Sequence, residues 1–253
     1  MSIFFRIVIP ARYASSRLPG KPLRDIAGKP MIQHVYERAM ESEAQAVIIA
    51  TDDQRIADAA TAFGADVCMT SPNHTSGTDR LAEVARLRGF ADQDIVINVQ
   101  GDEPCLPAQL INQVAEDLSI HHEAAIATLY APITDPQEIF DPNVVKVVTD
   151  AQGYARYFSR APIPWLRNYF ATDEVLPDQL PHKRHIGLYG YRCRFLHQYS
   201  SLQPCMPEQA ESLEQLRALF YGYHIHLTEA AVATGHGVDT ERDLAIVRQL
   251  LGE

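Results

Sequence analysis

The sequence predicts an α/β protein built on a doubly wound, mostly parallel β-sheet. Over roughly the first 120 residues, short apolar runs alternate with segments of helical periodicity, the pattern of parallel strands joined by helices. Apolar residues make up 46% of the 253 residues, which is enough for one large domain with a substantial core. In the second half the alternation gives way to a hairpin pattern and a long polar segment. We therefore expect a smaller mixed region beside the main sheet.

The elements of the first half follow from the apolar pattern. Strands are expected at residues 3–9, where the run ends at Pro10, and then at 46–52, 66–69 and 94–100. Helices are expected over 29–42, 53–64, 76–89 and 107–118. The first of these helices would bury one face, formed by Met31, Ile32, Val35, Ala39 and Met40.

The second half is less regular. A strand is expected at 124–132, a hairpin at 144–160, and a strand leading into a helix at 184–196. Residues 166–184 are polar and contain prolines, so a long loop is expected there. One helix is expected over 207–222, a strand over 224–230, and a last helix that opens with a capping box of Thr240 and Asp243. Because no linker or repeat interrupts the chain, residues 1–253 are expected to form a single domain.

Composition and charge exclude several classes of function. The net charge of −10 argues against a general nucleic-acid binder or a binder of anionic membranes, because both need a basic surface. No apolar run approaches the roughly 18 residues of a membrane span. The first residues lack the charged start and small-residue cleavage site of a signal peptide and are expected to form a strand. The four cysteines are scattered, which fits free thiols in a reducing cytoplasm.

A loop after the first strand concentrates basic residues in this acidic chain. It carries Arg12, Arg17 and Lys21 among small residues, with no carboxylate between them. The Gly-Lys pair is not a Walker A motif, because Pro22 replaces the serine or threonine and Ser15 replaces the earlier glycine. The small residues would still let backbone N–H groups approach a phosphate chain, and the cations would neutralise its charge. The alternative is a solvated loop that offsets the overall acidity.

Carboxylates follow the ends of other predicted strands. In an open parallel sheet, ligands bind beyond the carboxyl ends of the strands, where the basic loop, Asp52, Asp53, the Gln100 to Glu103 turn and Asp239 all fall. Asp102, after a buried strand and a glycine turn, is well placed to hold Mg²⁺ with phosphate oxygens and water. Asp239, just before the last helix, offers a second carboxylate. The alternatives are a turn cap at Asp102 and a helix-start carboxylate at Asp239.

Other catalytic signatures are missing from the sequence. It contains no G-x-S-x-G elbow and no H-E-x-x-H zinc motif. His224 and His226 would share one face of a strand, but zinc would need a third ligand. The remaining histidine pairs, 121/122 and 182/185, are expected to lie in loops.

Ten segments together resemble one family, 3-deoxy-manno-octulosonate cytidylyltransferase, the CMP-Kdo synthetase of Gram-negative bacteria. The resemblance runs from about residue 3 to residue 250 and is carried by IPARYASSRLPGKPL, GKPMIQHV, ATDD, HTSGTDRLAEV, VINVQGDEP, NVVKVV, YFSRAPIPW, HIGLYGYR, ESLEQLR and GVDTERDL. The first segment alone indicates only the wider group of nucleotidyltransferases, which includes the CMP-sialic acid synthetases. Asp79 and Pro162 stand where related sequences often carry Glu and Thr, and neither affects an assigned role.

The resemblance implies a reaction, a cofactor and partners. CTP and 3-deoxy-manno-octulosonate (Kdo) would give CMP-Kdo and pyrophosphate with Mg²⁺, for lipopolysaccharide synthesis, in a cytoplasmic homodimer. The fold would be that of the nucleotide-diphospho-sugar transferases, with residues 1–130 as the nucleotide-binding part. Residues 131–200 would form a hairpin and loop subregion that contributes to the sugar site and to dimer contacts.

The resemblance also implies site residues by position. Those around CTP are Ala11, Arg12, Arg17, Lys21, Ser76, Thr78 and Arg80. Those around Kdo are Gln100, Arg160, His185, Tyr189, Glu211 and Gln215. Those with catalytic roles are Lys21, Arg80, Asp102 and Asp239, the last two as metal ligands. Glu211 and Gln215, four residues apart, are expected on one helix face.

These roles agree with elementary chemistry. Phosphoryl-type transfer needs positioning and charge stabilisation more than covalent help from the protein. Metal held by Asp102 and Asp239 would align the sugar hydroxyl with the α-phosphate, and Arg160 would pair with the sugar carboxylate. Two alternatives stay open: a cytidylyltransferase for another sugar acid, such as 8-amino-Kdo or a sialic acid, and a CTP-binding sensor without catalysis.

Overall fold

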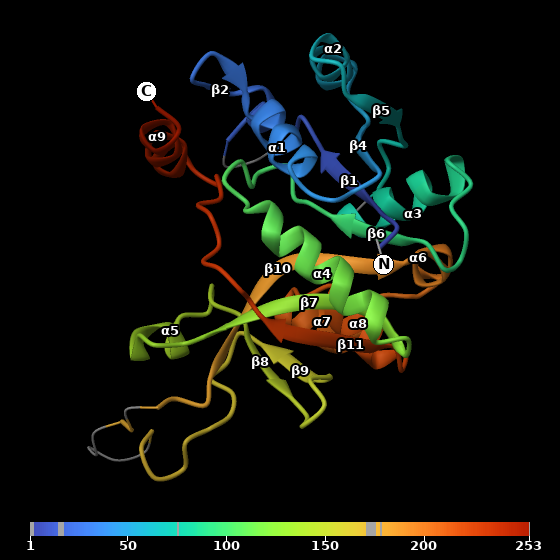
Figure 1. Cartoon of the computed structure of the whole chain (residues 1–253). Helices are drawn as coiled ribbons and strands as arrows, with labels where there is room; N and C mark the ends of the chain where they lie inside the picture. Colours follow the sequence, from blue (N-terminus) through green and yellow to red (C-terminus); the bar gives the residue numbers. More distant parts are fainter. Residues whose placement is uncertain (1–2, 15–17, 75, 171–175, 178, 253) are drawn as a thin grey trace.

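The computed structural model of the protein describes residues 3–14, 18–74, 76–170, 176–177 and 179–252. Within these ranges, nine strands form the main sheet, and helices cover both of its faces (Figure 1). The strands are β1 (Phe5–Ala11), β4 (Ala46–Thr51), β5 (Asp66–Met69), β6 (Ile95–Asn98), β7 (Ala124–Pro132), β8 (Lys146–Thr149), β9 (Ala155–Ser159), β10 (Lys183–Arg192) and β11 (His224–Glu229). A separate small hairpin pairs β2 (Asp25–Ile26) with β3 (Lys29–Pro30).

The sheet has the predicted, mostly parallel topology. Its order is β11-β7-β10-β6-β1-β4-β5. The neighbours β5, β4, β1 and β6 are parallel, as are β7 and β11, whereas β10 runs antiparallel to both β6 and β7. The β8–β9 hairpin extends from β10, so the predicted mixed region branches from the main sheet. Parallel strands bring their carboxyl ends to one edge, which is where Lys21, Asp102 and Asp239 lie.

Two layers of helices sandwich the sheet. The helices are α1 (Met31–Met40), α2 (Gln54–Ala62), α3 (Gly77–Leu87), α4 (Ala108–Ile120), α5 (Pro136–Phe140), α6 (Cys193–Tyr199), α7 (Met206–Glu211), α8 (Gln215–Phe220) and α9 (Glu241–Leu250). Alternation along β1 sends Ile7 and Ile9 into the core under α1, α2 and α4, and Val8 into the core under α3, α6 and α8. The sheet is thus buried on both faces, as near-continuous apolar strands require.

The last helix returns to the N-terminal loop. Leu244 and Val247 of α9 pack with Leu18, Ile26 and Met31 in a small core of their own. The predicted capping box at the start of α9 is confirmed, with Thr240 accepting from the Asp243 backbone and the Asp243 carboxylate accepting from the Thr240 backbone. This docking carries the segment before α9 to the carboxyl ends of β1 and β6.

Three boundaries differ from the sequence-based expectation. β1 continues through Pro10 to Ala11, in parallel register with β4. The expected helix over 207–222 is two short helices, because Ser212 adopts a left-handed conformation (φ 52°) between them. Met40, expected in the buried face of α1, is 56% exposed because the helix ends there.

Close packing of residues 235–238 against the loop after β6 makes Gly235 irreplaceable. A Cβ on Gly235 would lie 1.9 Å from the carbonyl oxygen of Cys105. We expect Gly235→Ala to lower the free energy of unfolding by about 1–3 kcal/mol or more, because backbone must shift to admit the methyl group. Gly187→Ala is the matched control, since a Cβ there would meet nothing within 4 Å. Denaturant unfolding of both variants checks this, and equal stabilities would contradict it.

None of the helices in the described ranges has the length and apolar character needed to cross a bilayer.

Candidate active site

A lysine ammonium lies between two carboxylates from distant parts of the chain. Lys21 Nζ is 2.8 Å from Asp102 Oδ2, 2.9 Å from Asp239 Oδ1 and 2.9 Å from the carbonyl oxygen of Val238. Lys21 begins a 3-10 turn after Gly20, whose φ of 66° suits a glycine. Asp102 follows β6, and Asp239 precedes α9. The structure therefore brings together three of the four residues predicted to be catalytic, Lys21, Asp102 and Asp239, at the sheet edge.

The backbone around this triad is tightly constrained. The Val238 N–H donates to the carbonyl of Asp102 at 2.8 Å, which fixes the segment before α9 against the loop after β6. A Cβ on Gly101 would lie 2.7 Å from the carbonyl oxygen of Pro10, so only glycine lets the ends of β6 and β1 approach this closely. The carboxylates of Asp102 and Asp239 are held within reach of one cation by main-chain contacts.

The carboxylates of Asp102 and Asp239 affect the protonation of Lys21 and of the neighbouring Glu103. Burial lowers the pKa of Lys21, but the charges and hydrogen bonds of Asp102 and Asp239 outweigh burial, so that the pKa is raised and the ammonium stays charged. The neighbouring Glu103 was not among the predicted site residues. Burial, together with the charges of Asp102 and Asp239, raises the pKa of Glu103 to about 7, while Lys21 opposes this rise. The edge of the sheet thus carries three carboxyl groups beside one lysine.

A cavity of about 370 Å³ opens beside the triad. Its lining includes Ala11, Arg12, Lys21, Gln100 and Asp102, so five of the predicted site residues share one space. Arg17, also predicted to bind the triphosphate, lies outside the described residues.

The amino end of α3 faces the same space. Gly77, the first residue of α3, lines the cavity. Ser76 caps α3 by accepting from the backbone of Asp79 at 3.1 Å. The N-terminus of a helix offers free N–H groups and a positive dipole end, which favours a bound anion. The lining of the cavity therefore includes a lysine, an arginine, a helix N-terminus and the carboxylate of Asp102.

Arg80, predicted to contact the nucleotide and the reacting phosphate, is fully buried. Its Nη2 lies 3.0 Å from Asp52 Oδ1, and its Nη1 donates to the Thr70 hydroxyl. Burial lowers the pKa of Arg80, opposed by Asp52 and reinforced by the nearby cation of Arg12. In this structure Arg80 is therefore held inside the protein from the first turn of α3, and direct contact with a phosphate would require it to move. Sequence analysis had placed Asp52 at the strand end but not as the partner of Arg80.

A second cavity of about 190 Å³ shares Gln100 with the first. Glu103, Arg184, His185 and Thr234 are among its other lining residues. His185 had been grouped with loop histidines, but it lies in β10, the strand expected from residue 184 onwards, with its ring against Phe158 and Tyr189. Sequence analysis did not single out Arg184, although an arginine directly before His185 in a strand was a visible signal.

Thr78, Tyr189 and Gln215 line a third, small cavity of about 40 Å³ with Tyr191 and Glu214. The expectation that Glu211 and Gln215 share one helix face is wrong, because Glu211 ends α7 and Gln215 begins α8. The left-handed Ser212 redirects the chain between them. Glu211 and Gln215 therefore belong to different helices, and a role for one does not imply a role for the other.

Arg160 and Glu211 contact each other at the end of β9. The Arg160 backbone N–H donates to Glu211 Oε2 at 2.9 Å, and Arg160 Nε donates to the Glu211 carbonyl at 2.7 Å. Arg160 Nη1 donates to the carbonyl of Pro142 at 2.8 Å. The two predicted sugar-pocket residues are thus a pair, anchored to the backbone beside the hairpin.

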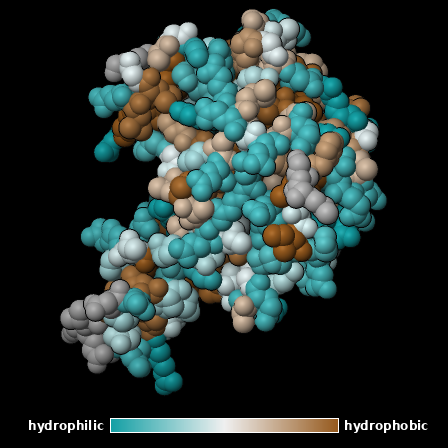
Figure 2. All heavy atoms as spheres, in the orientation of Figure 1, coloured by the Kyte–Doolittle hydropathy of each residue, from teal (hydrophilic) through white to brown (hydrophobic). Residues whose placement is uncertain are grey.

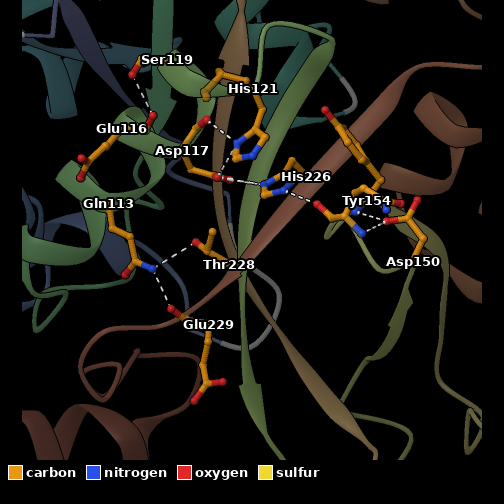
Figure 3. Close-up of polar contacts among 12 residues, drawn as sticks. Gln113, Glu116, Asp117, Ser119, His121, Asp150, Tyr154, His226, Thr228 and Glu229 are labelled. Carbon is orange, nitrogen blue, oxygen red and sulfur yellow. Dashed lines mark hydrogen bonds and ion pairs between the residues drawn. The ribbon is translucent and has the colours of Figure 1, made fainter.

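A cluster of titratable groups, with Asp117 and His226 buried and His121 half-buried, lies where the end of α4 meets β11. Asp117 and His121, at the end of α4, meet His226 near the start of β11 (Figure 3). His226 Nδ1 faces Asp117 Oδ2 at 2.9 Å and Nε2 faces the carbonyl of Gln152 at 2.9 Å. Because both partners only accept hydrogen bonds, both ring nitrogens carry protons and His226 is an imidazolium. Its contact with Gln152 ties the turn of the β8–β9 hairpin to the sheet.

The cluster has the residue types of a metal site but not the geometry. The rings of His121 and His226 are stacked, with centroids 3.5 Å apart and planes 17° apart. Imidazole binds a metal along its ring plane, so two nearly parallel stacked rings do not direct their nitrogens at one ion. The arrangement suits a proton shared with Asp117, so the zinc possibility raised for the His224–His226 segment gains no support.

Stability is expected to depend on pH through His226. Burial lowers the pKa of His226, but Asp117 outweighs burial and raises it. The stabilising pair is therefore complete below about pH 6.5, the ordinary histidine pKa, and is lost as pH rises through the raised pKa. Tyr154, Asp150 and His121 are the other titratable groups around the ring.

Two variants test this pH dependence. His226→Asn removes the titrating ring, and His122→Asn, at an exposed histidine, is the matched control. The free energy of unfolding of the wild type should exceed that of His226→Asn most at pH 6 and progressively less as the pH is raised. His122→Asn should follow the wild type. A gap that stays constant or widens with pH would count against the imidazolium.

Comparison with known proteins identifies the family of the chain. Residues 6–225 match the family model described as cytidylyltransferase. The chain is 59% identical over 247 residues to 3-deoxy-manno-octulosonate cytidylyltransferase of Vibrio vulnificus (strain CMCP6), covering 98% of each chain. It is 57% identical over 252 residues to the enzyme of the same name from Pseudomonas fluorescens, covering 99% of each.

Solved structures give the same result. A CMP:2-keto-3-deoxy-manno-octonic acid synthetase, solved in complex with CTP, superposes with a TM-score of 0.89 at 46% identity and 98% coverage of both chains. A 4-diphosphocytidyl-2C-methyl-D-erythritol synthase, at 16% identity and a TM-score of 0.64 over 99% of both chains, shares the fold. The chain belongs to the 3-deoxy-manno-octulosonate cytidylyltransferase family.

Proposed function

We propose that this protein transfers CMP from CTP to the anomeric hydroxyl of Kdo, releasing pyrophosphate, in the supply of activated Kdo for lipopolysaccharide synthesis. The observation that carries the proposal is the Lys21–Asp102–Asp239 triad at a cavity of about 370 Å³, in a chain 59% identical to a Kdo cytidylyltransferase. The triad supplies both charges that the reaction needs, a cation for the triphosphate and carboxylates for a metal.

The triphosphate is proposed to bind along the basic loop. Arg12 and Lys21 line the cavity with the N-terminus of α3, and Ala11 offers its backbone at the end of β1. These groups would neutralise the phosphates and hold the α-phosphate near Asp102. On binding, Lys21 would exchange its carboxylate partners for phosphate oxygens, which a long, flexible ammonium side chain allows.

Asp102 and Asp239 are proposed to hold Mg²⁺. Their carboxylates fit the ion, because both already reach one cation, Lys21 Nζ, from separate elements. Oxygen ligands from one or two carboxylates, completed by phosphate and water, are what Mg²⁺ prefers. When bound there, the ion supplies charge neutralisation of the phosphate and a lower pKa for the attacking hydroxyl. Asp102 and Asp239 orient the reactants around that position.

Kdo is proposed to occupy the cavity of about 190 Å³ that shares Gln100 with the nucleotide cavity. His185 and Gln100 can bond its hydroxyls, and Arg184 offers a cation for its carboxylate. The predicted Arg160 is not among the residues that line this cavity. Tyr189 and Gln215 lie together in the aromatic cavity of about 40 Å³. Because Gln100 lines both cavities, a sugar bound in this one would lie beside the proposed nucleotide cavity.

A homodimer is proposed to form through the projecting arm, of which the structure describes residues 160–170 and 179–182. The arm extends away from the sheet (Figure 1) and carries apolar side chains on a largely hydrophilic face (Figure 2). Phe140 and Trp165 are 54% and 57% exposed, and both rings contact Phe170. Exposed aromatic clusters of this kind mark protein interfaces. Sedimentation of the wild type and of Trp165→Ala over a range of protein concentrations tests this. The variant should dissociate at a higher protein concentration than the wild type, and a monomeric wild type would refute the proposal.

The sugar specificity is tested by a substrate panel. Purified protein with CTP and Mg²⁺ is offered Kdo, 8-amino-Kdo or a sialic acid, and released pyrophosphate is measured. Kdo should give the highest kcat/KM. Preference for another sugar acid would reassign the substrate, and CTP binding without turnover on any sugar would identify a nucleotide sensor. The net charge of −10 argues against nucleic acid as a partner.

A further inference from the structure

Thr128 lies under the proposed sugar pocket, where two neighbouring strands fall out of register. It belongs to β7 and is fully buried. Opposite it, β10 shifts register between Ile186 and Gly190, so that the carbonyls of Ile186 and Leu188 turn toward the threonine. Thr128 Oγ1 is 2.9 Å from the Ile186 carbonyl, 2.8 Å from the Leu188 carbonyl and 3.0 Å from His185 Nε2.

The protons in this cluster can be assigned by counting. A hydroxyl has one hydrogen to donate, and a carbonyl oxygen can only accept. If the Thr128 proton pointed at His185, two carbonyl oxygens would face hydroxyl lone pairs at 2.8 and 2.9 Å. The hydroxyl therefore donates to one of the carbonyls and accepts from His185. His185 Nε2 accordingly carries the hydrogen.

The ring of His185 then has one proton and one free acceptor. Burial lowers the pKa of His185 to about 3, so the ring is neutral at working pH. In a neutral imidazole with hydrogen on Nε2, Nδ1 carries the lone pair. Among the described residues, no hydrogen bond engages Nδ1. His185 lines the cavity that also holds Gln100 and Arg184.

We infer that Thr128 is a positioning residue: it holds His185 in the Nε2–H tautomer, so that Nδ1 accepts a hydrogen bond from a sugar hydroxyl. This inference rests on the proposed function, because it takes the cavity lined by His185 as the Kdo pocket. Hydroxyl groups are donors that Nδ1 can accept from, whereas the opposite tautomer would present an N–H and change which oxygen of the sugar is favoured. A residue that never touches the substrate thereby selects its orientation.

The chain offers a closely matched pair of variants. Thr128→Val keeps the volume and removes the hydroxyl, and Thr128→Ser restores a hydroxyl at the same atom. Thr61→Val is the control for the substitution itself, since the Thr61 hydroxyl donates to the backbone of its own helix at 2.8 Å, in α2. Thermal unfolding of each variant identifies any that fails to fold.

The direct readout is the ring-nitrogen NMR signature of His185, assigned by comparison with His185→Gln. The wild type and Thr128→Ser should show hydrogen on Nε2, and Thr128→Val should show a mixture of tautomers. Hydrogen on Nδ1 in the wild type, or an unchanged spectrum in Thr128→Val, would overturn the inference. This readout needs no turnover, so it stands or falls separately from the proposed function, which fails if Kdo is not a substrate of the wild type.

The kinetic readout separates positioning from general damage. Thr128→Val should raise KM for Kdo about 10-fold, the scale of one hydrogen bond, with KM for CTP unchanged and recovery in Thr128→Ser. In a His185→Gln background, Thr128→Val should add little, because the two residues act through one contact. Equal rises in both KM values, or additive effects in the double variant, would overturn the inference.

Discussion

Asp102→Asn is expected to reduce kcat by about 1,000-fold or more while the protein remains folded. Asparagine keeps the shape of the side chain but removes the negative charge that we propose for the metal. Asp102 is 37% exposed at its side chain, and the loop is also held by the bond from the Val238 N–H to its carbonyl. The substitution therefore costs charge at the site and little packing.

Steady-state pyrophosphate release and thermal unfolding, measured on the same preparation, check this prediction. Asp58→Asn, on the exposed face of α2, is the control and should keep both wild-type activity and wild-type stability. Asp239→Asn should resemble Asp102→Asn. A folded Asp102→Asn protein with near-normal kcat would remove Asp102 from the metal role.

Lys21→Met is expected to raise KM for CTP at least about 10-fold and to affect KM for Kdo much less. The variant keeps the apolar stem and removes the ammonium, which lies 2.8 Å from Asp102 and 2.9 Å from Asp239. Without it the two carboxylates face each other with no cation between them. We therefore also expect a lower melting temperature, with Mg²⁺ restoring more stability to the variant than to the wild type.

Lys29→Met is the matched control, because Lys29 pairs with Glu37 at the surface, away from the cleft. Initial rates over a matrix of CTP and Kdo concentrations separate the two KM values. Magnesium titrations followed by thermal unfolding give the second readout. An unchanged KM for CTP in Lys21→Met would exclude Lys21 from the triphosphate site.

The sheet could be predicted because its signal is local. The alternation of apolar runs and helical segments predicted the positions of the parallel strands β1, β4, β5 and β6. The capping box of Thr240 and Asp243 predicted the start of α9. The antiparallel insertion of β10 between β6 and β7 could not be predicted in the same way. Which strands pair depends on tertiary contacts between residues far apart in the sequence, and those contacts leave little trace in any single segment.

The same distinction between local and tertiary signals applies to the candidate site. The types and strand-end positions of Lys21, Asp102 and Asp239 indicated phosphate and metal chemistry, and the structure brings all three together. The break between Glu211 and Gln215 was missed because the apolar spacing of 207–222 is helical throughout, whereas a single left-handed residue, Ser212, divides the segment. The burial of Arg80 was missed because its partner Asp52 is close only in space.

Residues that act through a neighbouring side chain could not be predicted from the sequence either. Thr128 belongs to an ordinary apolar strand pattern, and nothing in the sequence distinguishes it. Its contacts with His185 and two carbonyls exist only because β10 shifts register opposite it. Glu103 likewise gains its raised pKa of about 7 from burial and from Asp239, which comes from the far end of the chain.

The most direct test of the central claim is product formation by metal-stripped protein given CTP and Kdo, before and after Mg²⁺ is added. We predict that CMP-Kdo and pyrophosphate appear in equal amounts only when CTP, Kdo and Mg²⁺ are all present, as measured by phosphorus NMR and mass spectrometry. Pyrophosphate released without Kdo, or no CMP-Kdo in the complete mixture, would contradict the proposed function.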